Sequence, residues 1–176
     1  VSAGCVGGFS GSLTEEQLGE EPAEPYQWDA ETDTHIVVTE NATFRAVYDI
    51  QTNDTEMEVY SRDGFGGTNA IPVRAVRYRY PNGTVITGTE FAAHGGSIEQ
   101  TNDAVIVEFP HEQDNWDNET AQFAFTSEST PKRFSLPTFR EGSYEVVLPP
   151  NRSIDFFLFR NVVPRDYSQT QIGTQE

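Results

Sequence analysis

Residues 75–87 read Ala-Val-Arg-Tyr-Arg-Tyr-Pro-Asn-Gly-Thr-Val-Ile-Thr, and this stretch gives the clearest indication of the fold. Val76, Tyr78 and Tyr80 alternate with arginines, so an extended strand would place these apolar side chains on one face. Arg77 and Arg79 would then point outward. The Asn-Gly pair that follows tolerates the positive φ angles of a tight primed turn. The stretch therefore predicts a β-hairpin.

The same alternation recurs along the chain in short runs that are separated by Asn, Asp, Gly and Pro. This pattern is typical of half-buried antiparallel strands, and no stretch shows a sustained helical period. In one run, Phe44, Ala46, Tyr48 and Ile50 fall on the same face. We expect strands at residues 35–39, 43–51, 55–62, 71–80, 84–87, 104–110, 120–127, 132–136, 143–148 and 153–159.

So many short strands favour an all-β fold, an antiparallel β-sandwich, with a partly open barrel as the alternative. An immunoglobulin-like topology is compatible with this pattern, although the cysteine pair of that fold is missing. We expect the segment from Lys132 to Phe159 to be the structural centre of the domain. Phe157 and Phe159 would cover one face of its last strand while Phe156 and Leu158 cover the other, as in a central strand.

The chain of 176 residues is long enough for one domain, and its 12% aromatic residues supply a core although the hydrophobic share is only 36%. Residues 1–5 look like the end of a signal peptide, 6–33 a flexible acidic tether, 34–167 the β-sandwich domain and 168–176 a polar tail. The tether has too few apolar residues to offset the cost of ordering it. Within it, Thr14-Glu-Glu-Gln17 has the form of a capping box, which allows a short helical turn.

The charge balance is strongly acidic: 28 Asp and Glu face 11 Lys and Arg, for a formal net charge of -17. At about 1 M salt the Debye length is about 3 Å, so repulsion among these carboxylates is screened. We therefore expect a halophilic protein, with an ordinary acidic protein as the alternative. Nucleic acid is not an expected partner, because the scattered arginines form no basic stripe.

Cys5 is the only cysteine, so no internal disulfide can form. It follows Val-Ser-Ala-Gly, and a cysteine directly after such a run of small residues is the pattern of a lipoprotein processing site. We predict that Cys5 carries a lipid that anchors the chain to the membrane. A stray cysteine in a flexible start is the alternative.

Five acceptor triplets for N-glycosylation favour export. None has proline in its middle position, and they begin at Asn41, Asn53, Asn82, Asn118 and Asn151. Together with Cys5, these sites indicate the extracellular face of the cell membrane.

The lipoprotein-like start, residues 79–84, and the run from Ser129 through Gly142 to Pro150 resemble an uncharacterised family of haloarchaeal membrane lipoproteins. The resemblance covers most of the chain after the tether. It implies a location and no chemistry, because the family offers no catalytic residue to carry over. Its members continue into a transmembrane helix, and this chain has no run of about 18 apolar residues. We expect either that the chain stops before such a helix or that lipid alone holds it.

No pattern marks a metal, cofactor or catalytic site. His35, His94 and His111 lack the spacing of a helical zinc site and read as surface or turn residues. Asp29, Glu31, Asp33 and Glu40 imitate the spacing of an EF-hand loop, but Thr34 stands where that loop requires glycine. Asp114, Asp117 and Glu119 are expected to form a solvated acidic loop, with a weak cation site or a sugar contact as the alternative. The arginines of the C-terminal third are expected to pair with surplus carboxylates, with an anion-binding face as the alternative; they are Arg133, Arg140, Arg152, Arg160 and Arg165.

We therefore expect a non-enzymatic extracytoplasmic domain with a structural or interaction role, whose partner is a surface protein or a glycan. The alternative is a carbohydrate-binding or carbohydrate-acting domain with exposed aromatic platforms such as Trp116 or Tyr167. A binding domain should present a coplanar aromatic patch or a pocket, whereas a structural module should bury its rings.

Overall fold

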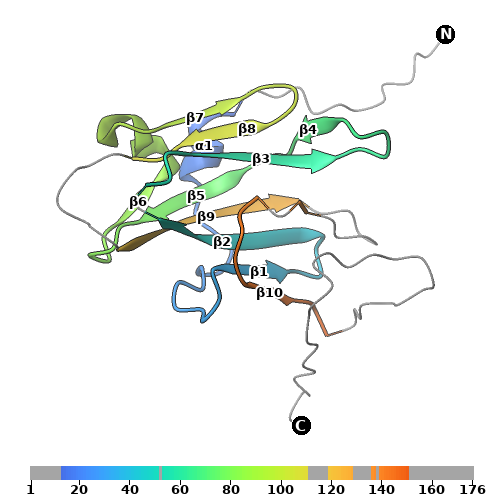
Figure 1. The fold of residues 1–176 in the computed structure, drawn as a ribbon, viewed down its shortest axis with the longest axis horizontal. Helices are drawn as coiled ribbons and strands as arrows, with labels where there is room; N and C mark the ends of the chain where they lie inside the picture. Colours follow the sequence, from blue (N-terminus) through green and yellow to red (C-terminus); the bar gives the residue numbers. More distant parts are fainter. Residues whose placement is uncertain (1–12, 52, 111–118, 129–135, 138, 151–176) are drawn as a thin grey trace.

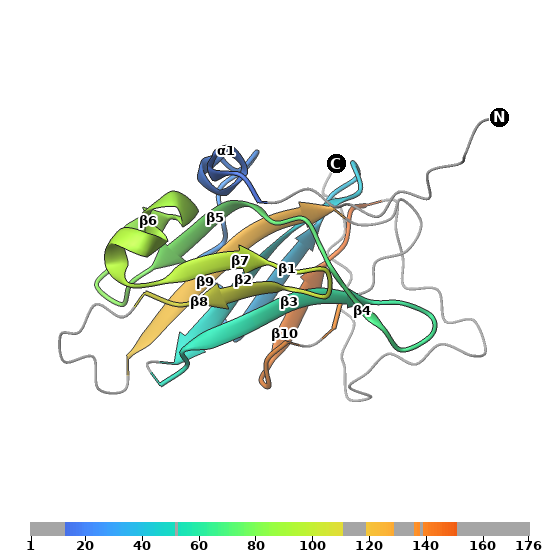
Figure 2. The ribbon, with the colours of Figure 1, turned by 90° about the horizontal axis from the view of Figure 1, so that it is seen from above.

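The computed structural model describes residues 13–51, 53–110, 119–128, 136–137 and 139–150. Two β-sheets pack face to face (Figures 1 and 2), so the predicted antiparallel β-sandwich is confirmed. One sheet has the order β10-β1-β2-β9-β5-β6 and the other the order β4-β3-β8-β7. The elements are α1 Glu15–Gly19, β1 Thr34–Val38, β2 Thr43–Gln51, β3 Glu56–Arg62, β4 Thr68–Ala70, β5 Arg74–Arg79, β6 Val85–Thr87, the 3-10 helix η1 Gly88–His94, β7 Ser97–Gln100, β8 Val105–Glu108, β9 Thr120–Glu128 and β10 Tyr144–Val147.

The strand order is not that of an immunoglobulin domain. Neighbouring strands pair antiparallel except for β1 and β10, which run parallel. One sheet of an immunoglobulin domain has the order C-F-G, and strand G follows strand F in the chain. In the four-stranded sheet here, β3, β8 and β7 would take the places of C, F and G. However, β7 precedes β8 in the chain, which is the reverse of the order of F and G. The immunoglobulin-like option is therefore wrong for this chain.

The hairpin of β5 and β6 forms as the sequence indicates, but its turn is not primed. Arg79 pairs with Val85, and the Gly83 N–H donates to the Tyr80 carbonyl at 2.8 Å. Pro81 therefore takes the first inner position of the turn, where its fixed φ suits an ordinary type I turn. Within this turn Gly83 alone has a positive φ, of 88°, and it completes a three-residue hairpin loop of the kind built on a type I turn.

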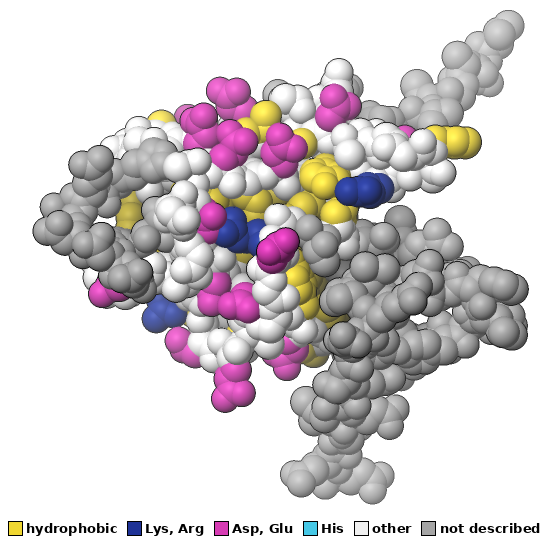
Figure 3. Space-filling view, in the orientation of Figure 1, with side chains coloured by type: hydrophobic (Ala, Val, Ile, Leu, Met, Phe, Trp, Pro, Cys, Tyr) yellow, Lys and Arg dark blue, Asp and Glu magenta, His cyan; other side chains and the backbone are white. Residues whose placement is uncertain are grey.

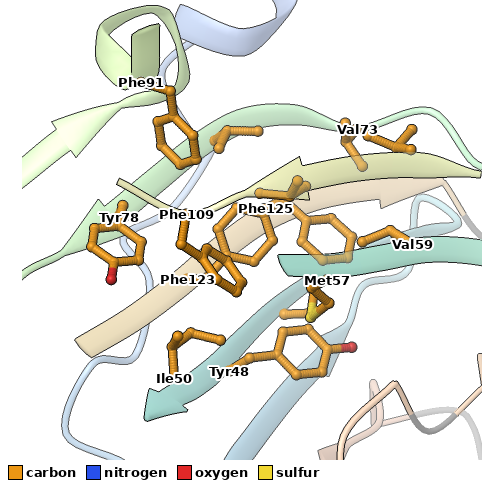
Figure 4. Packing of buried hydrophobic residues seen from close by; sticks show 14 of the residues in the cluster. Tyr48, Ile50, Met57, Val59, Val73, Tyr78, Phe91, Phe109, Phe123 and Phe125 are labelled. Atoms are coloured by element: carbon orange, nitrogen blue, oxygen red, sulfur yellow. The ribbon is translucent and has the colours of Figure 1, made fainter. Parts of the chain in front are cut away.

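The core lies between the two sheets and is built from aromatic rings (Figure 4). Phe123 and Phe125 of β9 contact each other and Tyr48 stacks on Phe125, with ring centroids 5.7 and 6.1 Å apart. Phe109, the residue after β8, and Phe91 of η1 close the cluster. The predicted inward face of residues 44–50 is confirmed, because all four of its apolar side chains belong to this core.

β10 departs from the expected structural centre. It is the outer strand of the six-stranded sheet, and Val146 and Val147 are 45% and 38% exposed. Its alternating sequence suits an edge strand as well as a central one, so the pattern could not place it. The predicted strands at 132–136 and 153–159 fall largely or wholly outside the described residues.

The described surface is acidic, as the composition requires (Figure 3). No helix in the described residues is long and apolar enough to cross a membrane.

Candidate functional site

Residues 13–33, which we call the strap, lie against the six-stranded sheet rather than hanging free. The strap begins with α1, where the Thr14 hydroxyl accepts the Gln17 N–H at 3.2 Å and the Gln17 side chain accepts the Thr14 N–H at 3.1 Å. The predicted capping box is therefore confirmed. Leu18 is only 8% exposed and packs with the core beside β5 and η1. Figure 2 shows α1 on the side of the six-stranded sheet that faces away from β7 and β8. The prediction of a flexible tether is wrong for residues 13–33.

Tyr26 holds the middle of the strap by completing an irregular strand. In β5 two residues stand opposite one residue of β9 between the pairs Arg74–Thr126 and Arg77–Ala124, which is a β-bulge. Ala75 lies in this bulge with a φ of 51°. The buried Tyr26 hydroxyl donates to the Ala75 carbonyl at 2.8 Å and lies 2.9 Å from the Thr126 hydroxyl. Burial raises the pKa of Tyr26 to about 12.

Arg77 supplies a buried polar contact between the sheet and the strap. Its guanidinium donates to the Glu20 and Val76 carbonyls, each at 2.9 Å, and lies 3.3 Å from the Glu21 carboxylate. Arg77 points away from the sandwich core as predicted, but the strap covers it and leaves only 7% of the residue exposed. A buried guanidinium needs such a full set of acceptors, because leaving its donors unpaired would cost several kcal/mol, on the order of 3–5.

Arg45 and Arg79 hold the strap on either side of Tyr26. The Arg45 guanidinium pairs with the Glu24 carboxylate. Arg79 lies 3.3 Å from the Asp29 carboxylate, and its guanidinium carbon lies 6.0 Å from the ring centre of Trp28. The strap's carboxylates thus meet arginines of β2 and β5, the two strands on either side of β9.

Apolar contacts complete the attachment. Val47 and Ala124 face away from the main core and are 4% and 0% exposed, because Tyr26 and Trp28 cover them. The Gln122 side-chain amide donates to the Trp28 carbonyl at 2.7 Å. A second, small hydrophobic cluster therefore lies under the strap.

The strap ends where it becomes β1, and there it meets the strand β10. The Asp33 carboxylate accepts both the backbone N–H and the hydroxyl of Ser143 at 2.7 Å, and these bonds lower the pKa of Asp33. Burial has the opposite effect on Asp49 and raises its pKa. His35 of β1 lies 2.7 Å from the Glu145 carboxylate and is buried, so its expected place at the surface is wrong.

Three of the predicted glycosylation sites lie in exposed turns: Asn41 between β1 and β2, Asn53 between β2 and β3, and Asn82 between β5 and β6. This placement leaves them accessible, and their use stays a prediction. Cys5, Asn118 and Asn151 lie outside the described residues.

The remaining polar residues predicted as sites make ordinary contacts where the structure describes them. Asp29 and Asp33 bind Arg79 and Ser143, so the EF-hand-like spacing is not assembled. No group of three or more potential metal ligands occurs among the described residues. Arg140 pairs with Asp54, as expected of the C-terminal arginines. His111, Asp114, Trp116, Asp117 and Tyr167 lie outside the described part.

A family model matches residues 30–176 and carries the description "family of unknown function (DUF5803)". The chain belongs to this family. No curated protein and no solved structure matches it. The DUF5803 match begins inside the strap, just before β1, so the sandwich is the part that the family shares.

The sequence did not reveal the contacts that attach the strap, above all the covered guanidinium of Arg77. One signal was present for them. Val47 and Ala124 stand at positions of β2 and β9 whose neighbours two residues away face outward, where polar residues are expected. Apolar residues on that face indicate that something covers it.

Proposed function

We propose that this DUF5803 domain is a non-enzymatic structural or interaction module, displayed on the outer face of the cell membrane and anchored through a lipid on Cys5. The observation that carries this proposal is the fixed strap. Because Tyr26 and Arg77 clamp this segment onto the sheet, residues 13–33 are not a free linker between the domain and Cys5.

Because the strap is fixed to the sheet, the domain lies closer to the proposed lipid anchor than a free tether over residues 6–33 would allow. The described part of the chain begins at Leu13, and Cys5 lies eight residues earlier, since 13 − 5 = 8. Eight residues reach at most about 26–29 Å when fully extended. The domain would therefore stand close to the membrane surface, which suits a spacer or docking module.

The disposition of the aromatic side chains supports the same role. Most rings of the described residues are buried in the core, and Trp28 lies half-buried over Tyr26 and beside Arg79. The carboxylates occupy the surface instead (Figure 3). This is the arrangement expected of a structural module rather than of an aromatic sugar-binding platform.

The test uses the thiol of Cys5, because it is the only one in the chain. Protein isolated from membranes of the native host is denatured and treated with a maleimide. We expect no reaction when a thioether lipid occupies the sulfur, and mass spectrometry of the N-terminal fragment should show the lipid. Protein made without export serves as the control and should react fully. A reactive Cys5 in the membrane-isolated protein contradicts lipid anchoring.

A further inference from the structure

The tip of the β3–β4 hairpin presents an aromatic side chain that the fold does not use. Phe65 is 102% exposed, whereas the other exposed large hydrophobic residues of the described chain reach at most 45%. The hairpin projects beyond the ends of the neighbouring described strands (Figures 1 and 2). The fold gains no stability from an apolar ring held in water, so Phe65 is available for contact with another surface.

The loop that carries Phe65 is fixed by its own hydrogen bonds. The Asp63 carboxylate accepts the N–H groups of Phe65 and Gly67 at 2.9 and 2.7 Å, and the Asp63 N–H donates to the Gly67 carbonyl at 2.9 Å. Gly66, which lies between Phe65 and Gly67, takes a φ of 90°. Phe65 is therefore presented from an ordered turn whose one carboxylate is directed at the backbone.

A cation, Arg62, lies three residues before Phe65, at the end of β3. The described residues include six arginines, and five of them, Arg45, Arg74, Arg77, Arg79 and Arg140, are paired with carboxylates. Arg62 is the sixth, and its guanidinium lies over the Tyr60 ring at 6.0 Å instead. In a chain with a net charge of -17, an arginine without an acidic partner is the exception among the described residues.

We propose that Phe65 and Arg62 form a contact for an anionic lipid bilayer, in which the ring enters the interface and the guanidinium binds headgroup phosphates. Aromatic rings and long cationic side chains are the residues that settle at this depth of a membrane. At molar salt the long-range repulsion between the acidic domain and the bilayer is screened, while contact-range pairing with a phosphate persists. The contact would fix the orientation of the tethered domain relative to the membrane.

The strength of the contact matches a tethered protein. Burial of one Phe side chain favours the bound state roughly 10- to 100-fold, which is too little to recruit a free protein. A tether raises the effective concentration to about the millimolar range, where so weak a contact still selects an orientation. This inference rests on the proposed anchoring near Cys5, and its test supplies the tether chemically so that the two can fail separately.

The test couples purified protein through Cys5 to maleimide lipids in vesicles, at molar KCl. Phe65→Trp reports insertion by the quenching of its fluorescence with lipids that are brominated in the acyl chain. The signal of wild-type protein gives the background from Trp28 and Trp116. Val85→Trp is the matched control, because Val85 is also an exposed hydrophobic residue but lies in β6.

We expect Phe65→Trp to be quenched at least twofold more on anionic vesicles than Val85→Trp, and Arg62→Gln to reduce that quenching. Equal quenching at the two positions, or none at Phe65→Trp, would overturn the proposal. If Phe65→Trp is not quenched on vesicles but a co-purified protein shields its fluorescence from a water-soluble quencher, the tip contacts a protein partner and the proposal is overturned. None of these outcomes depends on whether the cell attaches a lipid to Cys5.

Discussion

The hydroxyl of Tyr26 offers the sharpest test of the strap, because one oxygen atom can be removed without changing the shape of the side chain. In Tyr26→Phe the ring still covers Val47 and Ala124. The hydrogen bond to the Ala75 carbonyl, at 2.8 Å, is lost together with the contact to Thr126. The bulge prevents Ala75 from taking its regular place in the β5–β9 ladder, so its carbonyl would stay buried without a partner.

The expected cost follows from these contacts. A typical hydrogen bond contributes about 0.5–1.5 kcal/mol net, and leaving a buried acceptor unsatisfied costs about 1–3 kcal/mol. We therefore expect Tyr26→Phe to lower the free energy of unfolding by about 1–3 kcal/mol. Denaturant melts at molar salt measure this as a lower midpoint with an unchanged slope. Hydrogen exchange should show faster exchange at Leu18 and its neighbours in α1.

Tyr60→Phe is the matched control. The Tyr60 hydroxyl makes no hydrogen bond among the described residues, and its ring packs on Phe139. This change should alter stability by no more than about 0.5 kcal/mol. If Tyr26→Phe is as neutral as Tyr60→Phe, the strap does not close on the sheet, and the flexible tether suggested by its composition is the correct description.

The sandwich could be predicted from the sequence because local alternation determines it. β2 begins and ends at the residues predicted, and the hairpin of β5 and β6 turns between Tyr80 and Thr84, as the sequence indicates. β4 and β7 were not predicted. They are three and four residues long, Thr-Asn-Ala and Ser-Ile-Glu-Gln, and these runs show no strong apolar alternation. Their pairing with β3 and β8 makes them strands, and a local pattern does not contain that pairing.

The strap could not be predicted because its order comes from residues far away in the chain. Its own apolar content is small, and composition correctly indicates that it would not fold alone. Tyr26 meets Ala75 and Thr126, which lie 49 and 100 residues further on. The acidic composition that suggested disorder is also what binds the strap, because its carboxylates meet arginines of the sheet.

Three further predictions test the charge, the buried hydroxyls and the core. The melting midpoint should rise between about 0.1 M and about 3 M KCl, because salt screens repulsion among the acidic side chains; a flat or falling midpoint contradicts a halophilic surface. Stability should fall as the pH rises from 10 towards 12, because folded Tyr26 and Tyr78, each with a pKa of about 12, keep protons that unfolded tyrosines lose above pH 10. Melts at rising pH check this, and Tyr26→Phe should weaken the dependence. Tyr48→Phe should have the opposite effect to Tyr26→Phe. The Tyr48 hydroxyl is fully buried beside Phe125 and finds no hydrogen-bond partner within the described structure. Burying such a group costs about 1–3 kcal/mol, so its removal should leave stability unchanged or raise it by up to that amount. If Tyr48→Phe instead destabilises the protein as much as Tyr26→Phe, the hydroxyl has a partner such as a buried water, and the core at this point is polar rather than closed.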